Sequence, residues 1–174
     1  MKKLKRVTII GAPGTGKTVL ALKLKDIFDI PVCHIDSIHQ LPNWKLRPTE
    51  ERDRMIIEEA NKDEWILDGT FLDTLDYRIK RADLTIYLDF NSFSALKGVL
   101  TRIIKNHGKE KPDMPGCKEK FDLSFIAYVC RYNFERRKLI YGILNQNPDS
   151  DIRIVKYRKD LDGFIEELKR DFLE

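Results

Sequence analysis

The stretch Gly11-Ala-Pro-Gly-Thr-Gly-Lys-Thr18 decides the fold, because it fits the pattern G-x-x-x-x-G-K-[ST] of a phosphate-binding loop. An apolar run at 7–10 precedes it, and residues 19–28 follow with the apolar spacing of a helix. In this context the glycines let successive backbone N–H groups point at phosphate oxygens, and the helix N-terminus adds its positive end. The sequence therefore predicts a P-loop that binds a nucleoside triphosphate.

The contacts expected for the triphosphate come from this loop and the residue that follows it. They are Gly11, Ala12, Pro13, Gly14, Thr15, Gly16, Lys17, Thr18 and Val19. Lys17 is expected to reach the β and γ phosphates, and the hydroxyl of Thr18 to bind a magnesium ion that bridges them. ATP and Mg²⁺ are therefore the predicted cofactors.

Length and composition indicate one soluble domain. The 174 residues are enough for one core and too few for two ordinary domains, so 1–174 is predicted as a single domain. No stretch approaches the roughly 20 apolar residues of a membrane helix, and the charged start lacks a signal-peptide apolar run, which favours a cytoplasmic protein. The net charge of +4 suits an anionic ligand without demanding a polyanion.

Short apolar runs rich in Val and Ile recur along the chain, separated mostly by stretches with helical spacing. They lie at 7–10, 32–35, 65–67, 84–88 and 152–155. Alternation of this kind is typical of a parallel sheet covered by helices, and it predicts an α/β fold.

Two segments interrupt the alternation and are predicted to hold the moving parts of the site. The first is an acceptor-site insertion at about 37–62, which opens with a proline-punctuated stretch carrying His39 and Trp44. The second is a lid at about 102–138, whose centre is broken by glycines and prolines.

Three aspartates are expected at the carboxyl ends of strands, where ligands of parallel sheets bind. Asp68 is predicted to hold magnesium through its water shell. Asp36 is predicted to accept a proton from a substrate hydroxyl or to position the metal, against the alternative of capping a turn. Asp89 is expected to cap the helix that follows it.

Arginines near the lid are expected to stabilise the charge of a transferring phosphoryl group. The lid candidates are Arg102, Arg131, Arg136 and Arg137, of which Arg102, Arg131 and Arg137 are taken as catalytic together with Lys17 and Asp36. The acceptor contacts predicted are Asp36, His39, Trp44, Gly69, Arg78 and Arg81. A solvated helix face remains the alternative for each arginine, and core packing for His39 and Trp44.

The P-loop, His34-Ile-Asp36, Trp65-Ile-Leu-Asp-Gly69, Tyr87-Leu-Asp89 and Pro112-Asp-Met-Pro-Gly-Cys117 with Phe121-Asp together resemble the topology modulation protein family, relatives of adenylate kinase. The resemblance covers nearly the whole chain. It implies a three-layer α/β/α P-loop fold whose five parallel strands have the order 2-3-1-4-5, with ATP and magnesium as ligands. Adenylate kinases carry Asp-Gly-Phe-Pro-Arg where this chain has Asp68-Gly-Thr-Phe-Leu72, and the missing arginine argues against an AMP acceptor.

Two functions fit these features. One is a nucleotide-kinase-like enzyme that transfers the γ-phosphoryl group of Mg-ATP to a small-molecule acceptor, and the insertions flanking the site favour it. The other is a regulatory NTPase that acts on a protein or nucleic-acid partner, which the basic, aromatic run 131–138 favours, although no nucleic-acid-reading motif is present. Either would act as a monomer or a homodimer away from membranes.

Overall fold

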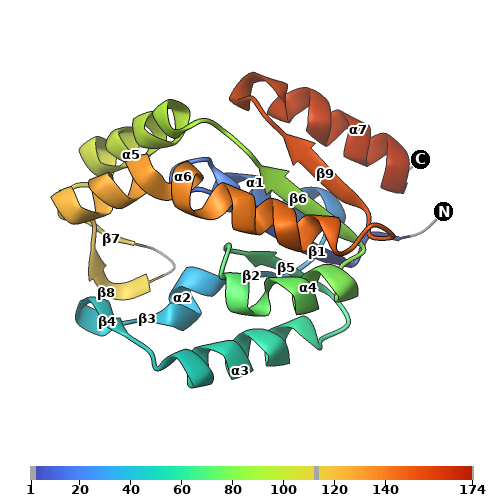
Figure 1. The fold of residues 1–174 in the computed structure, drawn as a ribbon, viewed down its shortest axis with the longest axis horizontal. Coiled ribbons are helices and arrows are strands. Elements are labelled where there is room, and N and C mark those ends of the chain that lie inside the picture. The colour runs from blue at the N-terminus through green and yellow to red at the C-terminus, as the bar shows by residue number, and fades with distance from the viewer. Residues whose placement is uncertain (1–2, 112–113, 174) are drawn as a thin grey trace.

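A central sheet of five parallel strands organises the computed structural model, which describes residues 3–111 and 114–173 (Figure 1). Along the sheet the order is β2-β5-β1-β6-β9. The strands are β1 (Arg6–Gly11), β2 (Val32–His34), β5 (Trp65–Asp68), β6 (Leu84–Leu88) and β9 (Ile152–Val155). If these five parallel strands alone are numbered 1 to 5 along the chain, their order across the sheet is 2-3-1-4-5, which confirms the predicted topology.

Helices cover both faces of the sheet, so the predicted three-layer α/β/α architecture is confirmed. Val7 and Ile9 pack with α1 (Lys17–Phe28) and α7 (Leu161–Leu173) on one face. Ile10 points to the opposite face, because successive side chains of a strand alternate. That face is covered by α4 (Leu75–Arg81), α5 (Ser92–Asn106) and α6 (Leu123–Asn145), with α2 (Ile35–His39) and α3 (Thr49–Ala60) packed nearer the β2 edge.

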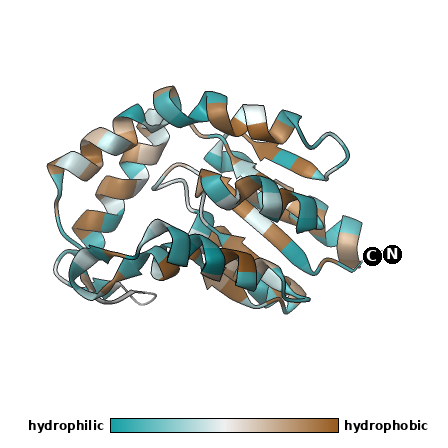
Figure 2. Ribbon diagram, turned by 60° about the horizontal axis from the view of Figure 1, so that its bottom comes forward, coloured by the Kyte–Doolittle hydropathy of each residue, from teal (hydrophilic) through white to brown (hydrophobic). Residues whose placement is uncertain are grey.

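Burial on both faces explains why the strands read as continuous apolar runs. Every residue of β5 and β6 is buried, including Trp65. The strands are coloured mostly as hydrophobic, whereas the helices carry both colours (Figure 2). None of the helices in the described ranges is long and apolar enough to cross a membrane.

The two predicted insertions meet each other at the carboxyl edge of the sheet (Figure 1). The first contains α2, β3 (Gln40–Leu41), the 3-10 turn η1 (Pro42–Trp44) and β4 (Lys45–Leu46), followed by α3. The second is the hairpin of β7 (Glu110–Lys111) and β8 (Met114–Lys118) between α5 and α6, with Pro112 and Asp113 outside the described residues. The thiol of Cys117 donates to the carbonyl of Leu41 at 3.5 Å.

Two short turns complete the chain, η2 (Leu72–Thr74) before α4 and η3 (Arg158–Asp160) before α7.

Asp36, expected at the end of the second strand, lies instead in the first turn of α2, because β2 ends at His34.

A close contact between two glycines docks α5 against the P-loop. Gly14 has a φ of 82°, and an ideal Cβ on Gly98 of α5 would lie 2.0 Å from the carbonyl oxygen of Gly14. No side chain larger than hydrogen fits there without moving α5 or the loop.

Substituting Gly98 therefore tests the docking of α5. We expect Gly98→Ala to lower the free energy of unfolding by about 1 to 3 kcal/mol, because the added methyl overpacks the contact. Gly142→Ala is the matched control, since Gly142 lies in helix α6 with no atom within 4 Å of an added Cβ. It should raise the free energy of unfolding by about 0.5 to 1 kcal/mol. Urea unfolding of both variants measures this, and equal responses would contradict the docking role.

Candidate functional site

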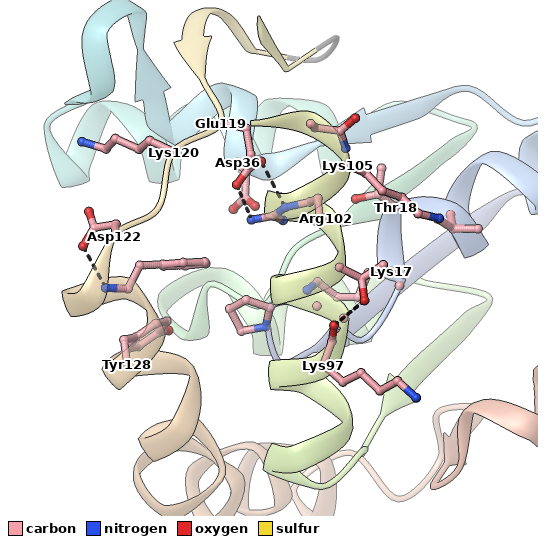
Figure 3. A pocket seen from close by; sticks show the side chains of 18 of the residues that line it. Lys17, Thr18, Asp36, Lys97, Arg102, Lys105, Glu119, Lys120, Asp122 and Tyr128 are labelled. Carbon is pink, nitrogen blue, oxygen red and sulfur yellow. Dashed lines mark hydrogen bonds and ion pairs between the residues drawn. The ribbon is translucent and has the colours of Figure 1, made fainter. Parts of the chain in front are cut away.

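A cavity of about 1220 Å³ opens at the carboxyl edge of the sheet, between the P-loop and the two insertions (Figure 3). Ligand pockets in proteins typically span roughly 300 to 1,000 Å³, so this volume suits two substrates side by side. The predicted site residues that line it are Pro13, Gly14, Gly16, Lys17, Thr18, Val19, Asp36, Trp44, Asp68 and Arg102. The cavity thus brings together P-loop, acceptor-site and lid residues from segments far apart in the sequence.

The P-loop has the open backbone that phosphate binding needs. Gly14 and Gly16 have φ angles of 82° and 95°, in the left-handed region that glycine reaches without strain. Inside the loop, the carbonyl of Ala12 accepts hydrogen bonds from the Thr15 hydroxyl at 2.8 Å and from Lys17 Nζ at 3.1 Å. Lys17 is therefore held across the loop by a single neutral partner that a phosphate oxygen can replace.

Two residues that the sequence analysis did not single out anchor the start of the loop. The hydroxyl of Thr70 accepts from the backbone N–H of Gly11 at 3.1 Å and donates to its carbonyl at 2.9 Å. Tyr132 of α6 also donates to that carbonyl, at 3.4 Å. No sequence signal marks these residues, because the contacts join positions 59 and 121 residues apart.

Asp68, at the end of β5, accepts a hydrogen bond from the last residue of the P-loop. Its Oδ2 accepts from the Thr18 hydroxyl at 2.7 Å and faces Nδ1 of His34 at 3.0 Å. Asp68 is buried, and its Oδ1 has no hydrogen-bond partner among the described residues. A buried carboxylate oxygen without a donor, next to a hydroxyl, fits a hydrated magnesium ion at this position.

The described residues hold no cluster of three or more His, Cys, Asp or Glu side chains arranged for a metal. A magnesium ion at Thr18 and Asp68 would therefore need oxygens from the triphosphate and water, as expected for Mg²⁺.

Asp36 lines the cavity from α2, and its charge acts on two tyrosines of α6. Burial raises the pKa of both Tyr128 and Tyr132, and the negative charge of Asp36 adds to the rise in each pKa. Both phenols are therefore neutral at physiological pH and can donate hydrogen bonds. Tyr128 lines the cavity, so Asp36 and a neutral phenol share its wall.

Arg102 of α5 lies at the centre of the cavity, next to Glu119 from the segment after β8 (Figure 3). Its Nε is 3.1 Å from Glu119 Oε2, and the Glu119 side chain is 5% exposed. This ion pair links α5 to the second insertion across the opening.

The three arginines of α6 have different surroundings, and none of them lines the cavity among the described residues. Arg131 pairs with Glu135 at 3.5 Å, with a side chain that is 66% exposed. Arg137 is bound to Asp89, from its Nη2 to Oδ2 at 2.7 Å. Arg136 is partly buried and makes no ion pair with the described carboxylates, and its positive charge opposes the rise in the pKa of Tyr128 and Tyr132.

The expectation that Asp89 caps a helix is wrong. Asn91 caps α5 instead, by accepting from the N–H of Ser94 at 2.8 Å. Asp89 is buried and accepts from Arg137 and from the hydroxyl of Tyr141 at 2.8 Å, so it ties α6 to the end of β6.

Arg78 and Arg81, predicted as acceptor contacts, donate to backbone carbonyls outside the cavity lining. Arg78 is fully buried, and its guanidinium donates to the carbonyls of Gly69, Thr70 and Phe71 at 2.9 to 3.0 Å. Burial lowers the pKa of Arg78 to about 9, which leaves it charged at neutral pH. Arg81 donates to the carbonyl of Ala60 at 2.7 Å.

Of the remaining acceptor candidates, one lines the cavity and two do not. Trp44 lines the cavity, whereas His39 packs its ring edge-on against Phe71 at 5.1 Å between centroids and does not line the cavity. Gly69 does not line it either, and its carbonyl is bound by Arg78. Gly11, Ala12 and Thr15 lie behind the part of the loop that faces the cavity.

Several lining residues that the sequence analysis did not propose come from α5 and the last loop. They are Ser94, Lys97, Gly98, Thr101, Lys105, Asn106 and Arg158. Arg158 donates to the carbonyl of Gly14 at 2.8 Å and lies over the ring of Phe90 at 5.4 Å. The position of Arg158 just after the fifth strand was the one sequence signal that could have pointed to it.

Comparisons with known proteins support the fold and go no further. No protein-family model matches the chain, and a search of curated proteins finds no match. The 1.7 Å crystal structure of shikimate kinase from Bacteroides thetaiotaomicron matches with a TM-score of 0.61 over 98% of this chain and 99% of that chain, at 14% identity. The chain therefore has the P-loop kinase fold, and the resemblance to the topology modulation protein family stays a prediction.

A substitution at Arg78 separates a structural role from acceptor binding. We expect Arg78→Met to lower the free energy of unfolding by at least about 3 kcal/mol, because three buried carbonyls lose a charged donor. Arg54→Met is the matched control, since the Arg54 side chain of α3 is 70% exposed, and it should change stability by less than about 0.5 kcal/mol. Thermal and urea unfolding measure both. Unchanged stability with loss of acceptor affinity would instead restore Arg78 as an acceptor contact.

Proposed function

We propose that this protein is a kinase that transfers the γ-phosphoryl group of Mg-ATP to a hydroxyl of a small acceptor. The observation that carries the proposal is that a P-loop and the carboxylate of Asp36, from a separate insertion, line one cavity large enough for two substrates. A protein that only hydrolyses ATP has no need for this second half of the cavity.

The triphosphate half contains the positive charge that phosphoryl transfer requires. Lys17 exchanges the carbonyl of Ala12 for β and γ phosphate oxygens, a charge-assisted contact stronger than the one it leaves. Arg102 lies at the middle of the cavity, where a transferring group would pass from one half to the other. Charge that spreads over the phosphoryl oxygens in the transition state is then met by fixed cations.

The magnesium ion that accompanies ATP neutralises phosphate charge and aligns the β and γ groups. The chain holds Thr18 Oγ1 and Asp68 in contact, with Oδ1 of Asp68 lacking a donor. His34, 3.0 Å from the other oxygen, keeps the carboxylate from turning away.

The acceptor half supplies a base next to the attacking hydroxyl. The acceptor oxygen forms a bond to the γ-phosphorus, the bond from that phosphorus to the bridging oxygen breaks, and ADP leaves. The hydroxyl proton passes to the carboxylate of Asp36. Arg136, partly buried beside Tyr128 and Tyr132, is the α6 arginine best placed to add charge here when the lid moves.

The fold likeness supports the proposal, because the matched protein is a kinase by name. The contact between the two insertions supports it as well, since Cys117 and Leu41 join the lid to the acceptor-site insertion, and both insertions line the cavity. Two insertions joined around a site can limit the access of water, which competes with the acceptor for the phosphoryl group.

A regulatory NTPase that contacts a macromolecular partner is the second candidate. One observation favours it: the outward face of α6 exposes 93% of Phe134 among Arg131 and Lys138. In that case ATP hydrolysis would be slow and indifferent to small acceptors, and the protein would be retained on DNA in a salt-sensitive manner.

Replacing Lys17 tests the triphosphate half. We expect Lys17→Ala to reduce ATP consumption at least about 100-fold, because the transition state loses a fixed positive charge. Lys23→Ala, on the exposed side of the same helix, is the control and should leave turnover unchanged. ATP consumption with magnesium is measured for both, with circular dichroism to confirm the fold. Wild-type turnover in Lys17→Ala would refute the mechanism.

Replacing Asp68 tests the magnesium site. Asp68→Asn keeps the shape but removes the charge, so we expect the magnesium concentration for half-maximal turnover to rise about 10- to 100-fold. Asp26→Asn is the control, because Asp26 lies on the exposed face of helix α1. A magnesium titration at fixed ATP measures the shift. An identical titration curve in Asp68→Asn would remove Asp68 from the metal site.

A further inference from the structure

Most of the cations that line the cavity lie in one half of it, and most of the carboxylates lie in the other, with Asp68 beside the P-loop as the exception. Lysines and arginines gather on the P-loop, α5 and the last loop, where Lys17, Lys97, Lys105 and Arg158 line the wall. The acceptor half, built by the first insertion and the segment 119–128, has a different lining. Figure 3 shows Lys17 and Thr18 on one side of the view and Lys120, Asp122 and Tyr128 on the other.

Carboxylates dominate the acceptor half. Asp36, Glu119 and Asp122 line it, against one lysine, Lys120, and Arg102 at its border. Arg102 is already paired with Glu119 at 3.1 Å. Lys120 lies 6.0 Å from the ring centre of Trp44, at the outer edge of the insertion. A phosphate or carboxylate placed in this half would face more negative charge than positive.

Three other arginines, Arg52, Arg78 and Arg81, are held by other groups, and Arg136 of α6 does not line the cavity. Arg52 is buried and bound to Asp53 and Asp73 at 2.7 to 2.8 Å. Arg78 and Arg81 donate to backbone carbonyls. Among the described residues that line the acceptor half, none is an arginine that could clamp an anion in the bidentate way.

The acceptor half also has flat apolar surfaces. Trp44, Phe125 and Tyr128 line it, with the rings of Phe125 and Tyr128 tilted by 34° at 6.4 Å. The Tyr128 phenol is neutral, because burial raises its pKa. Gln40 adds an amide to the lining whose buried oxygen has no partner among the described residues. Aromatic faces bind flat rings by stacking, and an amide reads paired donors and acceptors on a ring edge.

From this lining we infer that the acceptor is an uncharged hydroxyl compound with a flat heterocyclic ring, of the nucleoside class, and that nucleotides and carboxylates are rejected. The inference rests on the proposed function and specifies its substrate. Rejection follows because like charges brought together in a partly desolvated site repel each other, whereas a neutral hydroxyl next to Asp36 meets no such repulsion. The hydroxyl proton still passes to Asp36 during transfer to the γ-phosphorus.

Matched pairs of acceptors that differ in charge test the inference. With Mg-ATP and the wild-type protein, kcat/KM is measured for adenosine against AMP, cytidine against CMP, thymidine against TMP, and methyl shikimate against shikimate. ATP binding is measured separately by calorimetry. We expect a nucleoside to be phosphorylated with a kcat/KM at least about 100-fold above that of its monophosphate.

The outcomes separate this inference from the proposed function. A monophosphate or shikimate that is turned over faster than its neutral counterpart overturns the inference and leaves the kinase proposal intact. ATP that binds but is hydrolysed indifferently to every compound refutes the kinase proposal, and the inference fails with it. Absence of ATP binding refutes the P-loop assignment itself.

Variants of the acceptor half give a second, independent readout. Leu46 lines the cavity with a side chain 62% exposed, so Leu46→Arg adds a cation without disturbing the core. It should reduce the preference for nucleoside over monophosphate at least about 10-fold, whereas Leu46→Gln should not. Trp44→Leu should raise the KM for the nucleoside about 5- to 150-fold and leave the KM for ATP unchanged, with Trp44→Phe close to wild type. An unaltered preference in Leu46→Arg would show that charge does not select the acceptor.

Discussion

The structure depends on parallel pairing of β1 with strands on both sides. Ile9 is paired with Asp68 of β5, and Gly11 with Leu88 of β6, so these strands end at one edge of the sheet. Because a parallel sheet must bury both faces, helices return over it after each strand, and the loops at this edge are left to form the site. The P-loop, the metal candidate Asp68 and the insertions that line the cavity all lie at that edge.

The groups assigned to substrate binding already have protein partners in this state. Lys17 is bound to one backbone carbonyl, Arg102 to Glu119, and Thr18 to Asp68. Lys17, Thr18 and Arg102 are all at least partly exposed, so each contact can be exchanged for a phosphate oxygen or a metal ligand. The site is therefore organised before substrate arrives, which lowers the ordering cost of binding.

Residues without chemistry of their own keep this arrangement in place. The Thr70 hydroxyl holds both backbone groups of Gly11, and Gly98 lets α5 approach the loop closely. Arg78 fixes the backbone that follows Asp68 through three carbonyls. The sequence predicted Arg78 as a substrate contact, but its guanidinium has a structural role. What an arginine binds depends on its burial and on the carbonyls around it, and residue type alone does not decide it.

The sequence by itself determined the P-loop, the five strands and their parallel arrangement, and the place of Asp68, because each depends on neighbouring residues and on short periodic patterns. Only the tertiary structure decided which α6 arginines meet carboxylates and that Asp89 binds Arg137 and caps no helix. It also decided that most of the cations lie in one half of the cavity and most of the carboxylates in the other. These features join positions tens of residues apart. Their geometry follows from how helices pack on the sheet, which no local pattern encodes.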